Sequence, residues 1–394
     1  MKKHLVLGAL AVLALAACTK SEVVELNKGN EISLTAVTGK NLTKAADGYC
    51  NSHKPEDFQV WASTTTGKKV YFTNETYTNA SGTYKSTTAH YWPAENLDFF
   101  AAKNYDGATV NFDPTATDPA APFTFTGYTV NPTVSAQTDF IYAVNKDQAK
   151  GTGTAPLNFR HALSQIEFKA TNSNPNLRVF INGVTVANVK SKGDFKVSGE
   201  TDGTFEDHTH TFDPAHPDTD SRNAASRGTW SNQDVNKSYS VTFAEKEVAS
   251  GSTVDLTYSS GEYNPNSMYL LPQLLDVWTS GAAQATGQDK AYFLVNALIY
   301  NVADPSASFN KADNVVLWGD NSTGVWESAP IAVKIPSGLT WEDGKRYVYT
   351  FNFTTYGTGG SDPSSGDPVL TPIELTVTVD DFVDVVPAED IEVK

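Results

Sequence analysis

The chain has 394 residues and carries 45 acidic against 29 basic side chains, which gives a formal net charge of −16 at pH 7. A chain this acidic repels phosphate backbones, so its charge argues against nucleic-acid binding. Aromatic residues make up 11% of the sequence and only two residues are methionine, while Thr and Val are plentiful. This composition favours half-buried strands over helices.

The N-terminus has the parts of a secretory signal. Two lysines precede an apolar run from Leu5 to Leu15, which is too short to span a bilayer. The next residues complete Leu15-Ala16-Ala17-Cys18, which resembles a bacterial lipobox, in which the cysteine is lipidated and becomes the mature N-terminus. We predict a signal peptide over residues 1–17 and a lipid on Cys18; an ordinary cleaved signal with an incidental cysteine is the alternative.

Lipidation of Cys18 leaves Cys50 without a partner in the chain, so no internal disulfide framework is expected. A free thiol and a link between chains both stay open for Cys50. Removing residues 1–17 leaves 377 of the 394 residues. That is more than one hydrophobic core normally organises, which favours two domains.

Apolar and polar residues alternate along much of the chain, as in strands with one dry and one wet face. The pattern starts in Glu31–Val37, where Ile32, Leu34 and Ala36 share one face. The same period recurs in Phe123–Val130, Tyr239–Phe243, Thr253–Tyr258, Tyr347–Phe353 and Ile373–Val379. Ala291–Tyr300 is apolar on both faces, which predicts a central strand or a short buried helix. Together these patterns predict an all-β chain of antiparallel sandwiches.

Two polar stretches separate predicted strands. Ala149–Pro156 is small and flexible, so we expect a domain boundary there. Thr201–Lys237 is too long for a hairpin turn, and we expect a large surface loop in the second domain. The expected division is a signal peptide over 1–17, an anchor with the first strand over 18–44, an N-terminal sandwich over 45–155 and a C-terminal sandwich over 156–394.

Three histidines lie close together in Glu206–Asp218. His208 and His210 are spaced to share one face of a strand, and His216 with Asp207 or Asp213 could complete the shell of a divalent metal. The spacing matches no established zinc motif. We therefore favour a solvated loop without metal, and we expect no cofactor.

His161 lies in Leu157–Ala170, where the phase of the alternation changes. The change predicts a bend or bulge near Ser164 and Gln165. A hydrogen-bonded histidine at such a corner is favoured over a catalytic one, since no nucleophile-elbow pattern surrounds Ser164.

Other features with chemical interest also have structural explanations. Asp320 could join a calcium loop, but an Asx turn explains it more simply. Trp278, Trp318 and Trp326 could stack on sugar rings, although most tryptophans in a large sandwich fill the core. The sequence has no HExxH motif, no phosphate-binding glycine loop and no paired-cysteine metal knuckle. Carboxylate pairs for glycoside hydrolysis stay open, because 45 acidic residues allow many pairings.

Several stretches in order carry a resemblance to a known family. Besides the lipobox they are Phe58–Ala62, His90–Ala101, Asp139–Ala143, Leu157–Ala170, Tyr269–Gln273 and Trp341–Phe353. From about residue 30 to 380 the chain thereby resembles the fimbrillin-like family, the type V pilin subunits of Gram-negative gut and oral bacteria. The resemblance implies two transthyretin-like β-sandwiches in tandem and no enzyme activity. It also implies export as a lipoprotein to the outer membrane and a final place in a fimbrium at the cell surface.

The family's mode of assembly implies further sites and partners. A trypsin-like surface protease removes the first strand, here the one with Ile32, Leu34 and Ala36, and a strand from another pilin subunit replaces it. We favour a cut after Lys44, before Ala45, although family members are often cut after Arg and the first arginine here is Arg160.

The donor strand is expected beyond the last core strand, with the apolar residues Phe382, Val383, Val385 and Val386. A short tail folded back on its own sheet is an equal alternative, and Pro387 would interrupt a continuous donor strand. The alternative function is a permanently anchored lipoprotein that binds a glycan or a host or bacterial surface ligand, and a surface hydrolase is a third.

Overall fold

The computed structural model describes residues 30–38, 54–117, 122–151, 154–197, 228–257, 266–278, 290–354, 360–361, 368–369 and 373–381. In these ranges the regular elements are strands and two short 3-10 helices, η1 (Val134–Ala136) and η3 (Lys311–Asp313). The prediction of an all-β protein is confirmed. None of the helices within the described ranges has the length and apolar character needed to cross a membrane.

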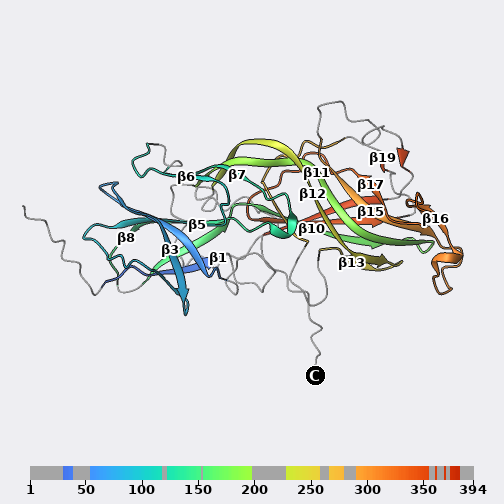
Figure 1. Ribbon diagram of the computed structural model, residues 1–394, viewed down its shortest axis with the longest axis horizontal. Helices are drawn as coiled ribbons and strands as arrows, with labels where there is room; N and C mark the ends of the chain where they lie inside the picture. The colour runs from blue at the N-terminus through green and yellow to red at the C-terminus, as the bar shows by residue number, and fades with distance from the viewer. Residues whose placement is uncertain are drawn as a thin grey trace, which may run out of the picture.

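Seven strands at one end of the molecule close into a ring, which we call the barrel (Figure 1, left). Its ladder order is β1 (Leu34–Thr38), β4 (Thr83–Ser86), β3 (Val70–Ala80), β2 (Asp57–Thr64), β5 (Leu97–Lys103), β8 (Ile141–Gln148) and β9 (Ala155–His161). Alternate residues of β2, such as Phe58, Val60 and Ala62, point into the barrel core. Trp61 points the other way, into a second core outside the barrel.

Two further sheets form the second body. One has the order β13 (Thr253–Asp255), β10 (Ser164–Asn172), β18 (Lys345–Phe353) and β21 (Ile373–Asp381), with β14 (Met268–Leu270) also paired to β10. The other has the order β16 (Val315–Trp318), β15 (Tyr292–Asn301), β11 (Leu177–Val197), β7 (Phe123–Thr129) and β6 (Thr109–Phe112), with β12 (Thr229–Val248) on β11 and β17 (Ala329–Val333) on β15. A short pair, β19 (Gly360–Ser361) and β20 (Pro368–Val369), stands apart.

Aromatic side chains hold these two sheets face to face. The ring of Phe293 on β15 lies 5.7 Å from Phe168 on β10 and 4.7 Å from Tyr349 on β18, measured between centroids. Such edge-to-face contacts contribute beyond the burial of apolar area. The second body is therefore a sandwich with an aromatic centre.

The long strand β11 joins the second body to the barrel. Its first half pairs with β15, while Lys192–Val197 pair with β7. The ring of Phe123 on β7 lies 4.7 Å from Trp61 on the outer face of the barrel. Figure 1 shows β6 and β7 over the barrel strands as a result.

The sheets do not part at the expected boundary between residues 155 and 156. β6 and β7 precede this boundary but belong to a sheet of the second body, and β9 follows it but completes the barrel. The reason is that β2, β5 and β8 have apolar side chains on both faces. Their outer face would be exposed to water unless another sheet packed on it.

The predictions for β15 and β12 had different outcomes. The stretch Ala291–Tyr300 forms the central strand β15, as predicted. The loop predicted over Thr201–Lys237 has the wrong C-terminal end, because β12 begins at Thr229. Residues 201–227 of that loop lie outside the described residues. β12 is polar on much of its surface because it is held through backbone pairing to β11, which needs no apolar side chains.

Two pairs of the described strands are parallel, whereas antiparallel sandwiches were expected. They are β1 with β9 and β10 with β18. A hairpin forces antiparallel pairing only between strands that follow each other closely, and these partners lie far apart in the sequence.

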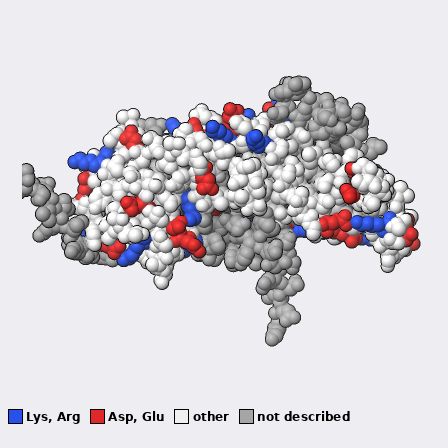
Figure 2. Space-filling model, in the orientation of Figure 1, with Lys and Arg blue, Asp and Glu red and all other residues white. Residues whose placement is uncertain are grey.

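Charged side chains of both signs are mixed on the face drawn in Figure 2. On this face, lysines and arginines of the described residues lie among acidic side chains rather than in one basic patch. A polyanion would therefore meet charges of both signs on this face.

Candidate functional site: the first strand in its slot

The apolar residues of β1 and the residue before it are buried in the barrel. Ile32, just before the strand, and Leu34 and Ala36 within it have no exposed surface and belong to the barrel core. Phe58, Tyr84 and Phe159 belong to the same core, and their rings lie 4.6 and 4.8 Å apart at Phe58–Tyr84 and Phe58–Phe159. The predicted strand and its apolar face are confirmed, while its removal stays a prediction.

The backbone of β1 is held mainly on one side. Five residue pairs join it to β9 in parallel, from Leu34–Ala155 to Thr38–Phe159. Toward β4 there is a single pair, Leu34 with Tyr84. The ring has no direct ladder between β4 and β9, so β1 alone closes it there. We call this position between β4 and β9 the β1 slot.

The chain before β1 rests on the irregular segment that follows β4. The Ile32 amide donates to the His90 carbonyl at 2.7 Å, and the Trp92 amide donates to the Asn30 carbonyl at 3.0 Å. Lys85 forms an ion pair with Glu31 at 2.9 Å, in which both side chains are partly exposed. Such a pair adds little stability, so the apolar face is the main attachment of this segment.

The apolar face of β1 sets the strength of this attachment. Burying an Ile or Leu side chain stabilises by about 1.5–3 kcal/mol, so Ile32 and Leu34 together contribute about 3–6 kcal/mol. Any strand that replaced β1 with similar apolar side chains would recover a similar amount, besides the ladder hydrogen bonds.

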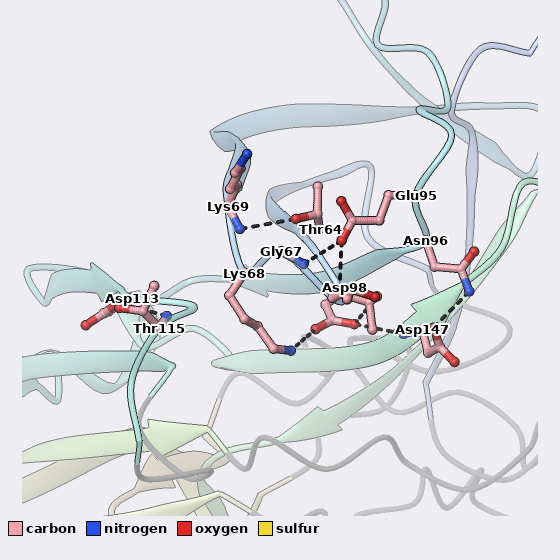
Figure 3. Close-up of polar contacts among 12 residues, drawn as sticks. Thr64, Gly67, Lys68, Lys69, Glu95, Asn96, Asp98, Asp113, Thr115 and Asp147 are labelled. Atoms are coloured by element: carbon pink, nitrogen blue, oxygen red, sulfur yellow. Dashed lines mark hydrogen bonds and ion pairs between the residues drawn. The ribbon is translucent and has the colours of Figure 1, made fainter.

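A polar cluster fastens other strands of the barrel to one another (Figure 3). The buried Asp98 carboxylate accepts hydrogen bonds from the Thr65 hydroxyl at 2.7 Å, the Asp147 amide at 2.8 Å and the Lys68 ammonium at 3.1 Å. Glu95 accepts from the amides of Thr66, at 2.9 Å, and Gly67. The turn between β2 and β3 is thereby tied to β5 and β8 by contacts that do not involve β1.

The surroundings of Asp98 act on its pKa in opposite directions. Burial raises the pKa of this carboxyl, but the hydrogen bonds from Asp147, Thr65 and Lys68, together with the Lys68 charge, outweigh burial and lower the pKa below its ordinary value. The ionised form therefore stabilises the fold above about pH 4, the ordinary pKa of an aspartate. This contribution is lost as the pH falls through the lowered pKa.

Asp98→Asn is expected to lower the free energy of unfolding by about 1–3 kcal/mol at pH 7. The asparagine amide has only one acceptor oxygen, so it cannot accept all the hydrogen bonds that the carboxylate receives from Thr65, Lys68 and Asp147. The variant should also lose part of the decline in stability below pH 4. Urea titrations from pH 7 to pH 3 measure both. The matched control is Asp276→Asn, which breaks the ion pair with Lys290 at a carboxylate that is 75% exposed and should cost about 0–1 kcal/mol. Equal losses from the two variants would contradict this role of Asp98.

His161 is a corner histidine, as predicted. β9 ends at His161, the chain bends at Ala162 and Leu163, and β10 begins at Ser164. The His161 Nδ1 atom lies 2.9 and 3.0 Å from the two carboxylate oxygens of the fully buried Asp139. The Ser164 hydroxyl donates to the Glu342 carbonyl at 2.7 Å. These contacts fix the corner between the barrel and the second body.

The remaining described candidates have structural roles or none. Asp320 forms an Asx turn, since its carboxylate accepts from the Ser322 amide at 2.8 Å and the Ser322 hydroxyl at 3.0 Å. Trp278 is buried, and the Trp318 indole donates to the Ala329 carbonyl at 3.1 Å. Trp326 is 44% exposed. Within the described ranges, no three His, Cys, Asp or Glu side chains gather in a way that could hold a metal ion.

Several predicted site residues lie outside the described residues. They are Cys18, Lys44, Ala45, Cys50, His208, His210, His216, Phe382, Val383, Val385 and Val386. Sequence reasoning missed the residues that form the β1 slot, above all Tyr84 and Phe159. Both lie in short alternating stretches, but nothing in those stretches indicates β1 as the neighbour.

The family of the chain follows from a match over most of its length. The family model described as fimbrillin-like matches residues 43–381. The chain belongs to the fimbrillin-like family. By sequence, no curated protein matches it.

Solved structures are similar to this member of the fimbrillin-like family. A fimbrial protein from Bacteroides vulgatus is 13% identical, with a TM-score of 0.50, and the match covers 90% of this chain and 99% of that one. The tip fimbrial protein Mfa3 from Porphyromonas gingivalis is 8% identical, with a TM-score of 0.34, and the match covers 89% and 99% of the two chains. At this identity, the likeness to the first structure shows the fold alone.

Proposed function

We propose that this protein is a fimbrial subunit that polymerises by strand exchange and serves adhesion at the cell surface. The observation that carries the proposal is the placement of β1. Its apolar face is fully buried, yet it alone closes the ring between β4 and β9. Membership of the fimbrillin-like family supports a place in a fimbrium, and the fimbrial protein from Bacteroides vulgatus with a similar fold agrees with it.

In the proposed route, the chain is exported and lipidated at Cys18, which holds it to the outer membrane. A lipid chain contributes about 0.8 kcal/mol per buried methylene, so two or more chains hold firmly. A trypsin-like protease then cuts after Lys44, before Ala45. This cut separates the anchor and β1 from the rest of the chain.

Loss of β1 would leave an apolar trough and two unpaired strand edges, those of β4 and β9. Such edges bind an added strand through main-chain hydrogen bonds, and side-chain pockets select it. We propose that the added strand comes from another subunit and contains Phe382, Val383, Val385 and Val386. These residues follow directly after β21, which ends at Asp381.

The test is limited trypsin digestion of the purified full-length chain, with sequencing of the new N-terminus and an unboiled denaturing gel. We expect a new N-terminus at Ala45 and a ladder of detergent-resistant multimers. Lys44→Ala should give no new N-terminus at Ala45 and should remain monomeric, and Lys40→Ala, which alters the other lysine between Thr38 and Ala45, should behave as wild type. A wild-type chain that resists cutting, or is cut and stays monomeric, would favour a permanently anchored lipoprotein that binds a surface ligand.

A further inference from the structure

The backbone of β1 faces a different neighbour on each side of the slot. The Ala155 amide donates to the Ser33 carbonyl at 2.9 Å, so Ser33 and every second residue after it turn their N–H and C=O groups toward β9. The Ile32 amide instead donates to the His90 carbonyl at 2.7 Å, on the side of β4. The inward residues of β1 therefore present their N–H groups to the β4 side, and these residues are Ile32, Leu34 and Ala36.

On this side, β4 is too short to reach Ala36. Leu34 pairs with Tyr84 in the antiparallel sense, and continuing this register places Ala36 opposite Gly82, in the turn between β3 and β4. Gly82 has a φ of +89°, and its amide donates to the Asn79 side chain at 2.8 Å. None of the described residues pairs with the backbone of Ala36 on the β4 side. A residue in the place of Ala36 therefore needs no N–H group, and proline is the residue that has none.

The slot is also narrow at this position. Ala36 has no exposed surface in the barrel core, whereas the positions of Ile32 and Leu34 hold large side chains. Adding carbon atoms to a packed core costs free energy. Proline adds two carbon atoms to alanine and closes them onto its own nitrogen, which here faces the open side. The slot thus favours two large apolar residues followed by a small residue or a proline, each two positions apart.

The sequence after β21 contains this pattern once. Val383, Val385 and Pro387 are two positions apart and follow β21 directly. A shift of the segment by one residue in either direction would turn Asp384 inward, and a shift by two would turn another acidic residue inward. A buried carboxylate without a partner is strongly unfavourable, so only one register of this segment fits the slot.

Charge on the outer face of the barrel agrees with this register. Ser33 lies opposite Lys85 when the pairing of β1 with β4 is continued by one residue. In the register above, Asp384 takes the place of Ser33. Lys85 forms an ion pair with Glu31 at 2.9 Å, and removal of β1 would take Glu31 away. The Asp384 carboxylate would then give Lys85 a new partner.

We propose that the donor strand of a second subunit enters the slot in the same direction as β1, with Val383, Val385 and Pro387 in the places of Ile32, Leu34 and Ala36. A strand in the opposite direction would turn the N–H groups of its inward residues toward β9, and Pro387 would then remove a ladder hydrogen bond. In the proposed direction, the proline instead takes a position that has no such hydrogen bond in β1. The inference rests on the proposed function, which supplies the donor segment.

Moving the proline tests the proposal in the full-length chain. Detergent-resistant multimers are measured on an unboiled denaturing gel after trypsin. The exchange of two neighbours, Val386→Pro with Pro387→Val, turns the missing N–H group toward β9 and puts valine in the narrow position. We expect at least about tenfold fewer multimers from this variant. Pro387→Ala is the control, since it keeps a small residue in that position and should form multimers as wild type does.

Two further comparisons test the register. Val385→Lys should abolish multimers, because it places an ammonium group in the barrel core. Ile391→Lys makes the same change further along the chain and should behave as wild type. Lys85→Glu should slow multimer formation about two- to fivefold, the range of an exposed ion pair, and adding Asp384→Lys should restore the rate.

The slot is tested separately, in the uncut chain. Ala36→Pro should leave the melting midpoint unchanged, because the N–H group that it removes has no partner among the described residues. Thr35→Pro is the matched variant. It removes a ladder hydrogen bond to β9 and should lower the midpoint by about 2 °C or more.

Three results would each overturn the proposal. They are equal destabilisation by Ala36→Pro and Thr35→Pro, wild-type multimers from the variant with the exchanged proline, and multimers that survive Val385→Lys. With multimers from the wild-type chain, any of them removes this register and leaves strand exchange intact. A wild-type chain that is cut and stays monomeric removes strand exchange, and this inference with it.

Discussion

Leu34→Lys is expected to make the uncut chain associate with itself. Leu34 has no exposed surface in the barrel core, and an ammonium group cannot be buried there without a partner. The variant β1 must therefore leave the slot and forfeit the apolar contacts of both Ile32 and Leu34. The open edges of β4 and β9 then become available to a strand from another molecule.

Size-exclusion chromatography and an unboiled denaturing gel of the full-length chain, without protease, measure this effect. We expect mostly multimers from Leu34→Lys and mostly monomer from wild type. The control is Thr35→Lys, which places the same charge on the opposite, less buried face of β1 and should stay monomeric. A folded, monomeric Leu34→Lys chain would argue that the slot does not accept strands from other molecules.

Trp61→Ala is expected to cost about 3–5 kcal/mol of stability. Trp61 is 3% exposed and joins the barrel to the sheet of the second body, with its ring 4.7 Å from Phe123 and 6.0 Å from Tyr105. The substitution leaves a cavity in the layer between the two bodies. Because the barrel core lies on the other face of β2, we expect the barrel and the second body to unfold in separate steps.

Calorimetry measures both the midpoint and the number of transitions in Trp61→Ala. At about 2–4 °C per kcal/mol for chains of this order of size, the midpoint of the weaker part should fall by at least about 6 °C. Trp326→Ala is the control, since Trp326 is 44% exposed and its loss should change the midpoint little. A loss below about 1 kcal/mol for Trp61→Ala would show that the layer between the bodies does not hold them together.

Local patterns in the sequence were sufficient for some features. Alternation determines which face of a strand is apolar, so the buried face of β1 could be predicted. A run that is apolar on both faces was enough to predict the central strand β15. The change of phase after His161 determined the bend between β9 and β10 in the same way. The order of several short motifs was enough to predict the family.

Other features depend on contacts between residues far apart in the sequence. Alternation within a strand does not predict which other strand pairs with it. The parallel pairing of Leu34–Thr38 with Ala155–Phe159 is therefore seen only in the folded chain. The sheets do not follow the expected boundary, because β6 and β7 belong to the sheet that covers the outer face of β2, β5 and β8, and no single segment reveals that this face must be covered. The first part of β12, from Thr229 to Lys237, is polar and looks like a loop by composition, but β11 holds it as a strand through backbone pairing.

The sequence by itself therefore determined the all-β class, the apolar face of β1 and the corner at His161. Each depends on the period of side chains within one segment, which the backbone geometry of a strand sets locally. The tertiary structure alone decided that β1 closes the barrel between β4 and β9 and that β6 and β7 join the sheet of the second body. Both are made by strands brought together from distant parts of the chain, where burial of apolar surface summed over many contacts selects the partner.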